Sequence, residues 1–338
     1  MRPELAAAIL ELRVSHPSWG PRKLRALLER LRPEEAWPAA SSIGDLLRRE
    51  GLIAGRRRVR RPLPFTRPFA PVCAPNDLWC IDFKGWFRTG DGARCDALTL
   101  SDADSRYLLV CRSVEPTTEG VEPVLERAFR RYGLPRAIRS DNGPPFAGCG
   151  AGGLSRLSVG WLKLGIGLER TDPGSPQQNA RHERLHGTLK RQTACPPARS
   201  LGAQQWRFDR FRREYNELRP HEALGQEPPG EHYRPSQRRY PRRIEEPHYP
   251  DDQAVRRVRS NGEIRWNGGL VFLSEALIGE PVGLAETHDG NWIVRFTSYP
   301  IGLIDRRTQK LKPFAPPRPG RHKAPEHNQK TVNDLTGL

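Results

Sequence analysis

Apolar residues recur at helical spacing in the first part of the chain. One apolar stripe runs through residues 4–16 and a second through residues 21–31, so both segments are predicted to form helices. A third, short helix is expected over residues 42–50, with Ser41 or Ser42 as its N-cap. Three short helices in this order are typical of a helix-turn-helix module, although any small helical bundle would give the same pattern.

The pattern changes after residue 75, where apolar and polar positions begin to alternate with a period of two. Strands are predicted over residues 78–87, 96–101, 107–113, 137–140 and 166–170, and helices over residues 118–132, 154–164 and 203–218. The basic segment 180–190 also has helical spacing and lies between the last strand and the last helix. The resulting order, βββαβαβα with a further helix, is that of an RNase H-like α/β core.

Short strands separated by glycine turns are predicted over residues 254–306. The pairs Asn261-Gly262, Asn267-Gly268 and Asp289-Gly290 favour tight turns, and the segment fits a small SH3-like β-barrel. The tail contains many prolines and basic residues and is predicted to be disordered. The predicted parts are a helix-turn-helix domain (1–54), a basic, proline-rich linker (55–75), an α/β core with its trailing helix (76–243), the β domain (254–306) and the tail (313–338).

The charge of the chain narrows the range of partners. Its 338 residues include 56 Lys and Arg against 39 Asp and Glu, a net charge of +17, which favours a polyanionic partner. Nucleic acid is expected before a membrane, because no apolar run is long enough to span one. A high arginine content can also follow from genomic base composition, so the net charge alone does not identify the class of partner. The six cysteines are scattered without a CxxC pair, which predicts reduced, mostly buried thiols and argues against a zinc site.

Two groups of basic residues are candidates for DNA contacts. Those on the helical module are expected to face outward, and Ser42 lies on the helix that would enter a major groove. Those in the linker fit an extended path along a phosphate backbone, although a solvated tether would give the same pattern. The candidates are Arg22, Lys23, Arg48 and Arg49 in the module and Arg56, Arg57, Arg58, Arg60 and Arg61 in the linker.

Three acidic residues stand out against this basic background. Asp82 lies within the strand-like stretch LWCIDFKGW, where a carboxylate is costly unless its charge is compensated. Asp141 ends a second predicted strand in RSDNGPPF, and Glu183 lies on the basic helix after the loop SPQQN. If the two strands are neighbours, both aspartates emerge at one edge of the sheet. A helix packed there through Leu185 and Leu189 would turn Glu183 toward them, and Mg²⁺ is the cation that such carboxylates would hold.

The three blocks LWCIDFKGW, RSDNGPPF and SPQQNARHERLHGTLK, in this order, resemble the catalytic core of DDE transposases and retroviral integrases. The chain is most similar to bacterial insertion-sequence transposases with an integrase-type core. Residues 214–238 are also similar to the segment that follows the core in that family. The likeness runs from about residue 15 to residue 243 and covers about two thirds of the chain.

The resemblance implies a function and its requirements. Asp82, Asp141 and Glu183 match the catalytic metal ligands of the family, so the chain is expected to be a polynucleotidyl transferase that uses Mg²⁺ or Mn²⁺ and no small-molecule cofactor. Its substrate would be double-stranded DNA, both the element ends and the target. We expect a homo-multimer assembled on DNA in the cytoplasm of a bacterium, associated with the nucleoid and not with a membrane.

Further residues of the third block are candidates for DNA contacts. His186, Gly187 and Lys190 share the helical face of Glu183. His186 and Lys190 are expected to contact phosphates near the scissile bond, while an ordinary surface histidine is the alternative for His186. The loop before the helix offers amide groups for bases or sugars, from Gln177, Gln178 and Asn179.

The sequence predicts a DNA transposase that cleaves and joins the ends of its own insertion element by phosphoryl transfer. The alternative is a truncated, non-catalytic DNA-binding remnant that occupies element ends and represses transposition. It arises because members of the family commonly carry a further helical unit, whereas this chain starts at Met1 within a helical pattern. A nuclease for RNA in hybrids is less consistent, since the flanking DNA-binding modules would then be superfluous.

Overall fold

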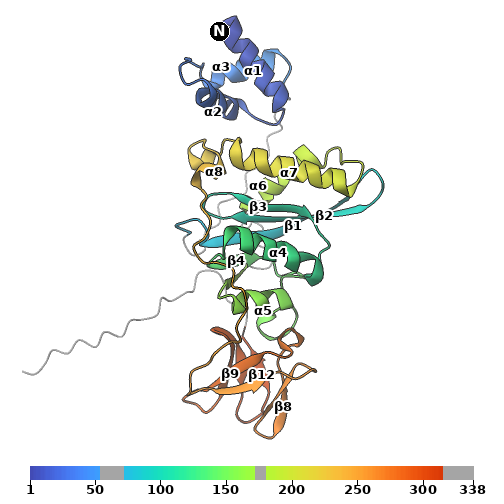
Figure 1. Cartoon of the computed structure of the whole chain (residues 1–338), viewed down its shortest axis with the longest axis vertical. Helices are drawn as coiled ribbons and strands as arrows, with labels where there is room; N and C mark the ends of the chain where they lie inside the picture. Colours follow the sequence, from blue (N-terminus) through green and yellow to red (C-terminus); the bar gives the residue numbers. More distant parts are fainter. Residues whose placement is uncertain (54–71, 172–179, 315–338) are drawn as a thin grey trace, which may run out of the picture.

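The computed structural model describes residues 1–53, 72–171 and 180–314. A three-helix unit lies at one end of the molecule, an α/β core in the middle and a β domain at the other end (Figure 1). The linker residues 54–71, the loop 172–179 and the tail from residue 315 lie outside the described residues. The predictions made for them are therefore untested.

The three-helix unit contains α1 (Pro3–Ser15), α2 (Pro21–Leu31) and α3 (Ala40–Arg49). The apolar stripes of these helices enclose a small core of fully buried side chains, formed by Ile9, Trp19, Leu24, Ile43 and Leu47.

The predicted serine N-cap of α3 is wrong. The helix begins at Ala40, and its N-cap residue Ala39 makes no side-chain hydrogen bond. Ser41 and Ser42 lie inside the first turn and are exposed. Alanine has the strongest helix propensity, so the Ala39-Ala40 pair allows the helix to start before the serines.

The core is built on a mixed five-stranded sheet in the order β3-β2-β1-β4-β5. Its strands are β1 (Leu78–Arg88), β2 (Arg94–Asp102), β3 (Leu108–Ser113), β4 (Ala137–Ser140) and β5 (Gly167–Arg170). Its helices are α4 (Thr118–Tyr132), α5 (Arg156–Lys163), α6 (Ala180–Thr193), α7 (Leu201–Glu217) and the short α8 (Pro229–His232). β1, β4 and β5 run parallel, while β2 and β3 are antiparallel to their neighbours. The predicted order of elements is confirmed.

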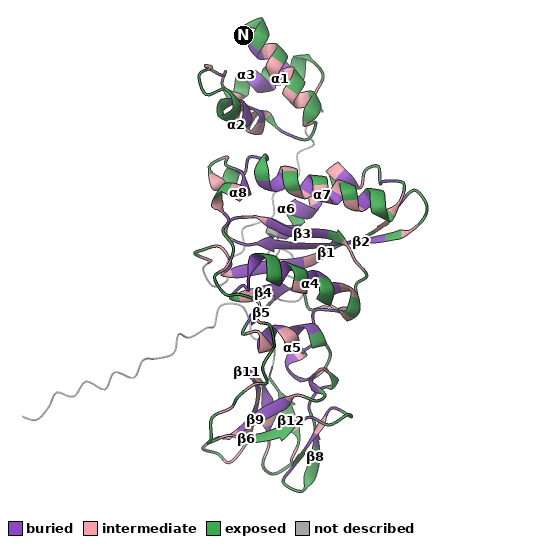
Figure 2. Ribbon diagram, in the orientation of Figure 1, coloured by how far each residue is buried: buried purple, intermediate pink, exposed green. Residues whose placement is uncertain are grey.

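Helices cover both faces of this sheet (Figure 2). On one face, apolar residues of β1 and β2 such as Trp79 and Leu98 pack with α4. On the other face, residues of β2 and β3 pack under α6 and α7, where Leu185 and Phe208 are buried. Because the period-two alternation of the strands sends successive residues to opposite faces, Asp82 faces the α6 side together with Thr99, its cross-strand partner.

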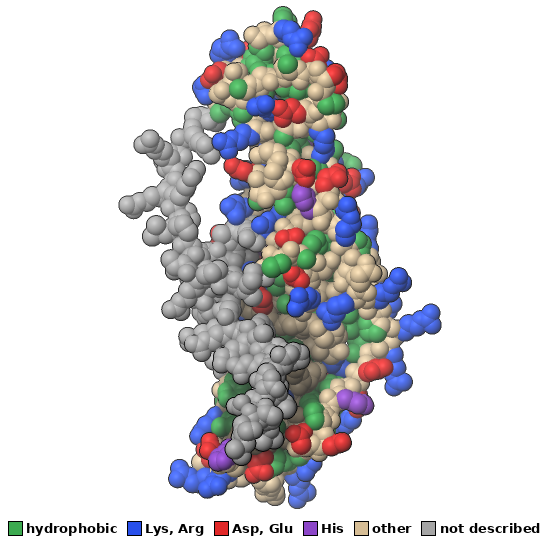
Figure 3. Space-filling view, turned by 90° about the vertical axis from the view of Figure 1, so that its left-hand side faces the viewer, with side chains coloured by type: hydrophobic (Ala, Val, Ile, Leu, Met, Phe, Trp, Pro, Cys, Tyr) green, Lys and Arg blue, Asp and Glu red, His purple; other side chains and the backbone are tan. Residues whose placement is uncertain are grey.

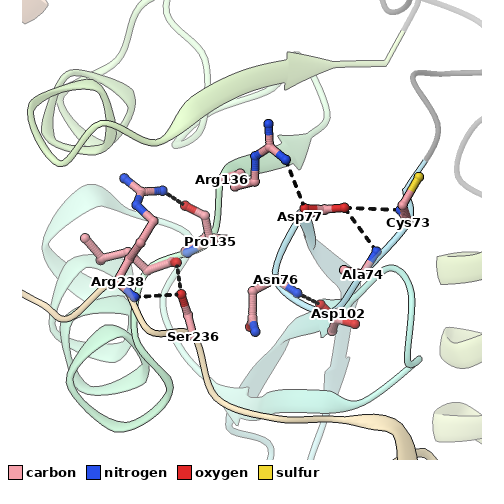
Figure 4. A network of polar contacts seen from close by, with 10 residues as sticks. Cys73, Ala74, Asn76, Asp77, Asp102, Pro135, Arg136, Ser236 and Arg238 are labelled. Carbon is pink, nitrogen blue, oxygen red and sulfur yellow. Dashed lines mark hydrogen bonds and ion pairs between the residues drawn. The ribbon is translucent and has the colours of Figure 1, made fainter.

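A segment that follows α8 helps to align β1 with β4 (Figure 4). Ser236 donates its hydroxyl to Leu134 O at 2.7 Å, and the guanidinium of Arg238 donates to Pro135 O. At the start of β1, the backbone N–H of Asn76 donates to the buried carboxylate of Asp102 at 2.7 Å. These contacts lie just before the first residues of β1 and β4.

The C-terminal domain contains two antiparallel sheets. Five strands, in the order β12-β11-β10-β9-β6, form the larger sheet, and the hairpin β7-β8 forms the smaller one. Their bounds are β6 (Ala254–Arg257), β7 (Glu263–Trp266), β8 (Gly269–Phe272), β9 (Pro281–Glu286), β10 (Trp292–Phe296), β11 (Tyr299–Ile304) and β12 (Leu311–Pro313). The predicted turn at Asn267-Gly268 is confirmed, with both residues at positive φ. The SH3-like barrel stays a prediction.

Two predicted boundaries of this domain are wrong. It extends beyond residue 306, because Leu311 pairs with Ile304 and adds an edge strand to the sheet. Pro313, placed at the start of the disordered tail, is the last residue of that strand. An edge strand of three residues has too short an alternation to be recognised from sequence.

The β domain and the α/β core share one apolar cluster. The hydroxyl of Tyr299 donates to Gly152 O at 2.9 Å, and Lys163 of α5 forms a 2.7 Å ion pair with Glu280. The two predicted domains are therefore in direct contact through the segment that follows Asp141.

The thiols only partly follow the prediction. All six cysteines are free, but Cys73, Cys149 and Cys195 are exposed because they lie in connections between elements. Only Cys95 and Cys111, on the α7 side of the sheet, are buried, and burial raises the pKa of both thiols. Among the described residues, no helix is both long and apolar enough to cross a membrane.

Candidate active site

Asp82 and Asp141 lie on neighbouring parallel strands. In the pairing of β1 with β4, Cys80 is opposite Arg139. Continuing this register by two residues brings Asp82 beside Asp141, at the point where β4 ends. The condition set for this placement, that the two strands are neighbours, is met. Only Asp141 follows the end of its strand, however, because β1 continues past Asp82 to Arg88.

The loop after β4 partly shields the Asp141 carboxyl group. Although the residue is exposed, the surrounding protein desolvates this group and raises its pKa, against opposing effects from the Gly143 N–H and the charge of Arg170. A carboxylate whose charge is disfavoured in this way gains from a nearby cation.

Arg170, the last residue of β5, holds the Asp141 loop, and sequence reasoning missed it. The residue is 5% exposed, and its guanidinium donates to three oxygens. These are Ser140 Oγ, Asp141 O at 3.3 Å and Phe146 O at 2.6 Å. The signal in the sequence was an arginine at the end of a short buried strand, where a charge needs compensation.

Two histidines of α6 anchor the helix to the sheet. His182 Nε2 lies 2.7 Å and His186 Nε2 lies 2.8 Å from the same hydroxyl, Thr99 Oγ1. That hydroxyl also lies 3.2 Å from Asp82 O, which can only accept. Because a hydroxyl donates once and accepts twice, Thr99 donates to Asp82 O and both Nε2–H groups donate to Thr99. This leaves the Nδ1 lone pair of His186 facing Asp82 Oδ2, at 4.0 Å.

The prediction that His186 contacts a DNA phosphate is wrong. The residue is only 8% exposed, and burial lowers its pKa to about 2, with smaller effects from His182 and Lys84. A neutral, buried imidazole cannot contribute a positive charge to DNA binding. The residue is inward because Thr99 offers a partner for two histidines one helical turn apart, which the sequence of the helix does not reveal.

Glu183 and Lys190 lie on the exposed side of α6. Among the described residues, no group of three His, Cys, Asp or Glu side chains is close enough to hold a metal ion, so Glu183 is not brought together with the aspartates. Asp82 and Asp141 nevertheless suit Mg²⁺, which is often held by one or two carboxylates with waters and substrate phosphates. Gln177, Gln178 and Asn179, which precede α6, lie outside the described residues.

The basic residues of the three-helix unit divide into two groups. Arg48, Arg49 and Ser42 are exposed on α3, as predicted. Arg22 is exposed but pairs with Glu222 of the core at 2.9 Å. Lys23 does not face outward, because its ammonium group reaches the core and donates to Pro220 O. The linker arginines 56–61 lie outside the described residues.

The α/β core and the β domain each match known protein families. The integrase core domain family matches residues 73–176, and a second integrase core domain family matches residues 164–229. The C-terminal domain of the IS481 family of transposases matches residues 253–312. The α/β core is thus an integrase core, and the β domain that follows it is similar to that transposase domain.

Two relatives then identify the family. Over 238 residues, 67% of this chain, the sequence is 31% identical to the insertion element IS476 uncharacterized 39.2 kDa protein of Xanthomonas euvesicatoria, of which it covers 64%. It is 34% identical over 238 residues to the insertion element IS407 uncharacterized 31.7 kDa protein of Burkholderia multivorans, of which it covers 79%. The chain belongs to the family of insertion-element transposases with an integrase-like core.

Among solved structures, the core is similar to the HTLV-2 integrase catalytic core domain in complex with magnesium, at 18% identity. That match covers 47% of this chain and 98% of the other, with a TM-score of 0.36. The simian T-cell lymphotropic virus intasome matches 92% of this chain at 16% identity, with a TM-score of 0.41.

Thr99→Val is expected to destabilise the protein by about 2 kcal/mol, because it leaves two buried imidazole N–H groups without their shared acceptor. The measurement is the free energy of unfolding in urea. Thr193→Val is the matched control, since among the described residues that buried hydroxyl bonds only to Leu189 O, within α6. Equal losses in the two variants would contradict the anchoring role of Thr99.

Acidification is expected to destabilise the metal-free protein. In the folded state, burial lowers the pKa of His182 to about 4 and that of His186 to about 2. In the unfolded chain both titrate near about 6.5, so below that pH the unfolded state binds more protons. The free energy of unfolding should therefore fall by about 2–4 kcal/mol between pH 7 and pH 5.

Urea titrations at the two pH values test this expectation. His182→Gln should reduce the pH dependence, whereas the exposed His288→Gln should leave it unchanged. Equal stability at pH 5 and pH 7 would mean that the imidazoles of α6 are not kept neutral by burial.

Proposed function

We propose that the chain is a metal-dependent DNA transposase that cleaves and joins the ends of its own insertion element. The observation that supports it best is the placement of Asp82 beside Asp141, with the helix that carries Glu183 anchored to the same strand region through Thr99. Membership of the insertion-element transposase family is the reason for proposing DNA as the substrate and phosphoryl transfer as the reaction.

Asp82 and Asp141 would hold Mg²⁺ or Mn²⁺, and Glu183, which is not grouped with them in this structure, would join them as the third carboxylate in the complex with DNA. The bound metal would stabilise negative charge on the attacking and leaving oxygens of the phosphodiester. The chain itself positions the groups: Arg170 fixes the Asp141 loop and Thr99 fixes α6 against β1. Positioning and electrostatic stabilisation are the main contributions that protein groups make to phosphoryl transfer.

DNA binding would use the basic surface of all three parts of the molecule. Basic side chains are spread over the face seen in Figure 3, in the three-helix unit, the core and the β domain. Arg48, Arg49 and Ser42 on α3 would enter a major groove, in a helix-turn-helix arrangement. Lys190, exposed on the face of α6 that carries Glu183, would contact a phosphate near the scissile bond. We further propose that the protein assembles as a homo-multimer on DNA at the nucleoid of a bacterial cell.

The test is cleavage of a labelled duplex that carries an end of the element. We expect strand cleavage with Mg²⁺ or Mn²⁺ and none with EDTA, under conditions where the duplex is fully bound. Specific binding without cleavage in either metal would overturn the enzymatic proposal. It would leave the second candidate, a DNA-binding remnant that represses transposition, for which the supporting observation is that Glu183 is exposed and forms no group of three with Asp82 and Asp141 among the described residues.

A further inference from the structure

A strongly basic cavity lies where the three-helix unit meets the core. It has a volume of about 460 Å³ and is lined by parts of α2, α6 and α7, the turn between β2 and β3, and the segment after α7. Its charged lining residues are Lys23, Arg106, Arg184, Arg219 and one acid, Glu222, and its other titratable lining residues are His221 and Tyr215. Glu222 also pairs with Arg22, at 2.9 Å, so one carboxylate is shared between that arginine and the four cations of the cavity.

Arg219 brings unused hydrogen-bonding capacity to the cavity. The residue is 9% exposed, and its guanidinium lies over the ring of Trp19, 5.8 Å from the centroid. Within the described residues, its Nη1 is buried and has no hydrogen-bond partner. A buried charged donor without an acceptor is costly, and such groups are found where a ligand completes them.

The other basic groups repel one another across the same space. Burial lowers the pKa of Lys23 to about 8, with a further decrease from the charge of Arg219 and an opposing effect of Glu222. His221 is kept neutral, with its pKa lowered to about 3 by burial and then by the charges of Lys23, Arg219 and Arg106. An anion in the cavity would relieve this repulsion, because each cation would gain an opposite charge within a partly desolvated space.

We propose that this cavity binds a phosphate group of the DNA backbone and so joins the three-helix unit to the catalytic helix on one strand. The identity of the DNA rests on the proposed function, whereas the anion site rests on the cavity itself. Lys23 comes from the N-terminal unit and Arg184 follows Glu183 directly on α6. A phosphate held by both side chains would fix the distance between the three-helix unit and the cleavage site.

The experiment measures binding of the full chain to a duplex carrying the element end, as a function of salt. Lys23→Gln and Arg184→Gln should each weaken binding by about five-fold and reduce the log–log salt slope by about 0.9, the value for one phosphate contact. The double variant should lose no more slope than either single variant, because both cations contact the same phosphate. Arg213→Gln removes one exposed charge from α7 outside the cavity and should leave the slope nearly unchanged.

A second arm distinguishes the source of the phosphate. Inorganic phosphate is titrated into the same variants by calorimetry, and duplex binding is competed with it. Tight binding of inorganic phosphate that depends on Lys23 and Arg184, combined with unchanged duplex binding in the variants, would overturn the DNA assignment. Slope losses that add in the double variant, or unchanged slopes in all variants, would overturn the shared phosphate. Binding is read without cleavage, so a failed cleavage assay leaves this inference standing.

Discussion

Asp82→Asn and Asp141→Asn are each expected to reduce Mg²⁺-dependent cleavage of an element end by about 10³-fold or more, while DNA binding changes little. Each change keeps the size of the side chain and removes the charge that would hold the metal. Phosphate contacts come from lysines and arginines elsewhere, so the complex should still form. Single-turnover cleavage of a labelled duplex, together with its dissociation constant, provides the measurement.

The matched control is Asp251→Asn, the same change at an exposed position of the connection before the β domain. It should cleave like the unaltered protein. A variant of either site aspartate that retains normal cleavage would remove that residue from the catalytic assignment.

Glu183→Gln tests the third carboxylate separately, because Glu183 is exposed on α6 and forms no group of three with the aspartates among the described residues. A loss as large as that of the aspartate variants would indicate that Glu183 joins them in the DNA complex. Normal cleavage would indicate a site that functions with two carboxylates.

The order of elements in the core could be predicted because it depends on local periodicity. Strands with alternating residues and helices with a repeating apolar face are selected by their own sequence, as for α4, whose predicted range 118–132 matches the observed helix. The adjacency of the strands that carry Asp82 and Asp141 was left conditional, because the order of elements along the chain does not by itself fix the order of strands in the sheet.

The orientation of the polar residues could not be predicted in the same way. The sequence of α6 indicates that His182 and His186 lie one turn apart, but not that Thr99 of β2 provides a partner for both. Lys23 was expected to face outward with the other basic residues of the three-helix unit, whereas here Pro220 O accepts a hydrogen bond from its ammonium group. In both cases the deciding partner is distant in sequence, so only the tertiary structure reveals it.

Arg170 shows the same limitation most clearly, since the carbonyl group of Phe146 that it contacts is far along the chain. We expect Arg170→Met to lower the free energy of unfolding by about 3 kcal/mol, because the variant keeps the aliphatic bulk and leaves Ser140 Oγ and two carbonyl oxygens without their donor. Removing a guanidinium whose own burial is costly, as its lowered pKa indicates, offsets part of the loss.

The same variant should reduce cleavage by about 10²-fold in the folded protein, because a small displacement of the Asp141 loop misplaces one of the two aspartates. The turnover number should fall while the dissociation constant for the duplex stays nearly constant. Arg139→Met is the matched control. Arg139 is also buried, and it forms a 2.7 Å ion pair with Glu169, the residue opposite it in the pairing of β4 with β5, outside the Asp141 loop. It should lose comparable stability yet cleave at close to the normal rate, measured well below its melting temperature. If Arg170→Met behaves like this control, Arg170 supports the fold alone and the position of Asp141 does not depend on it.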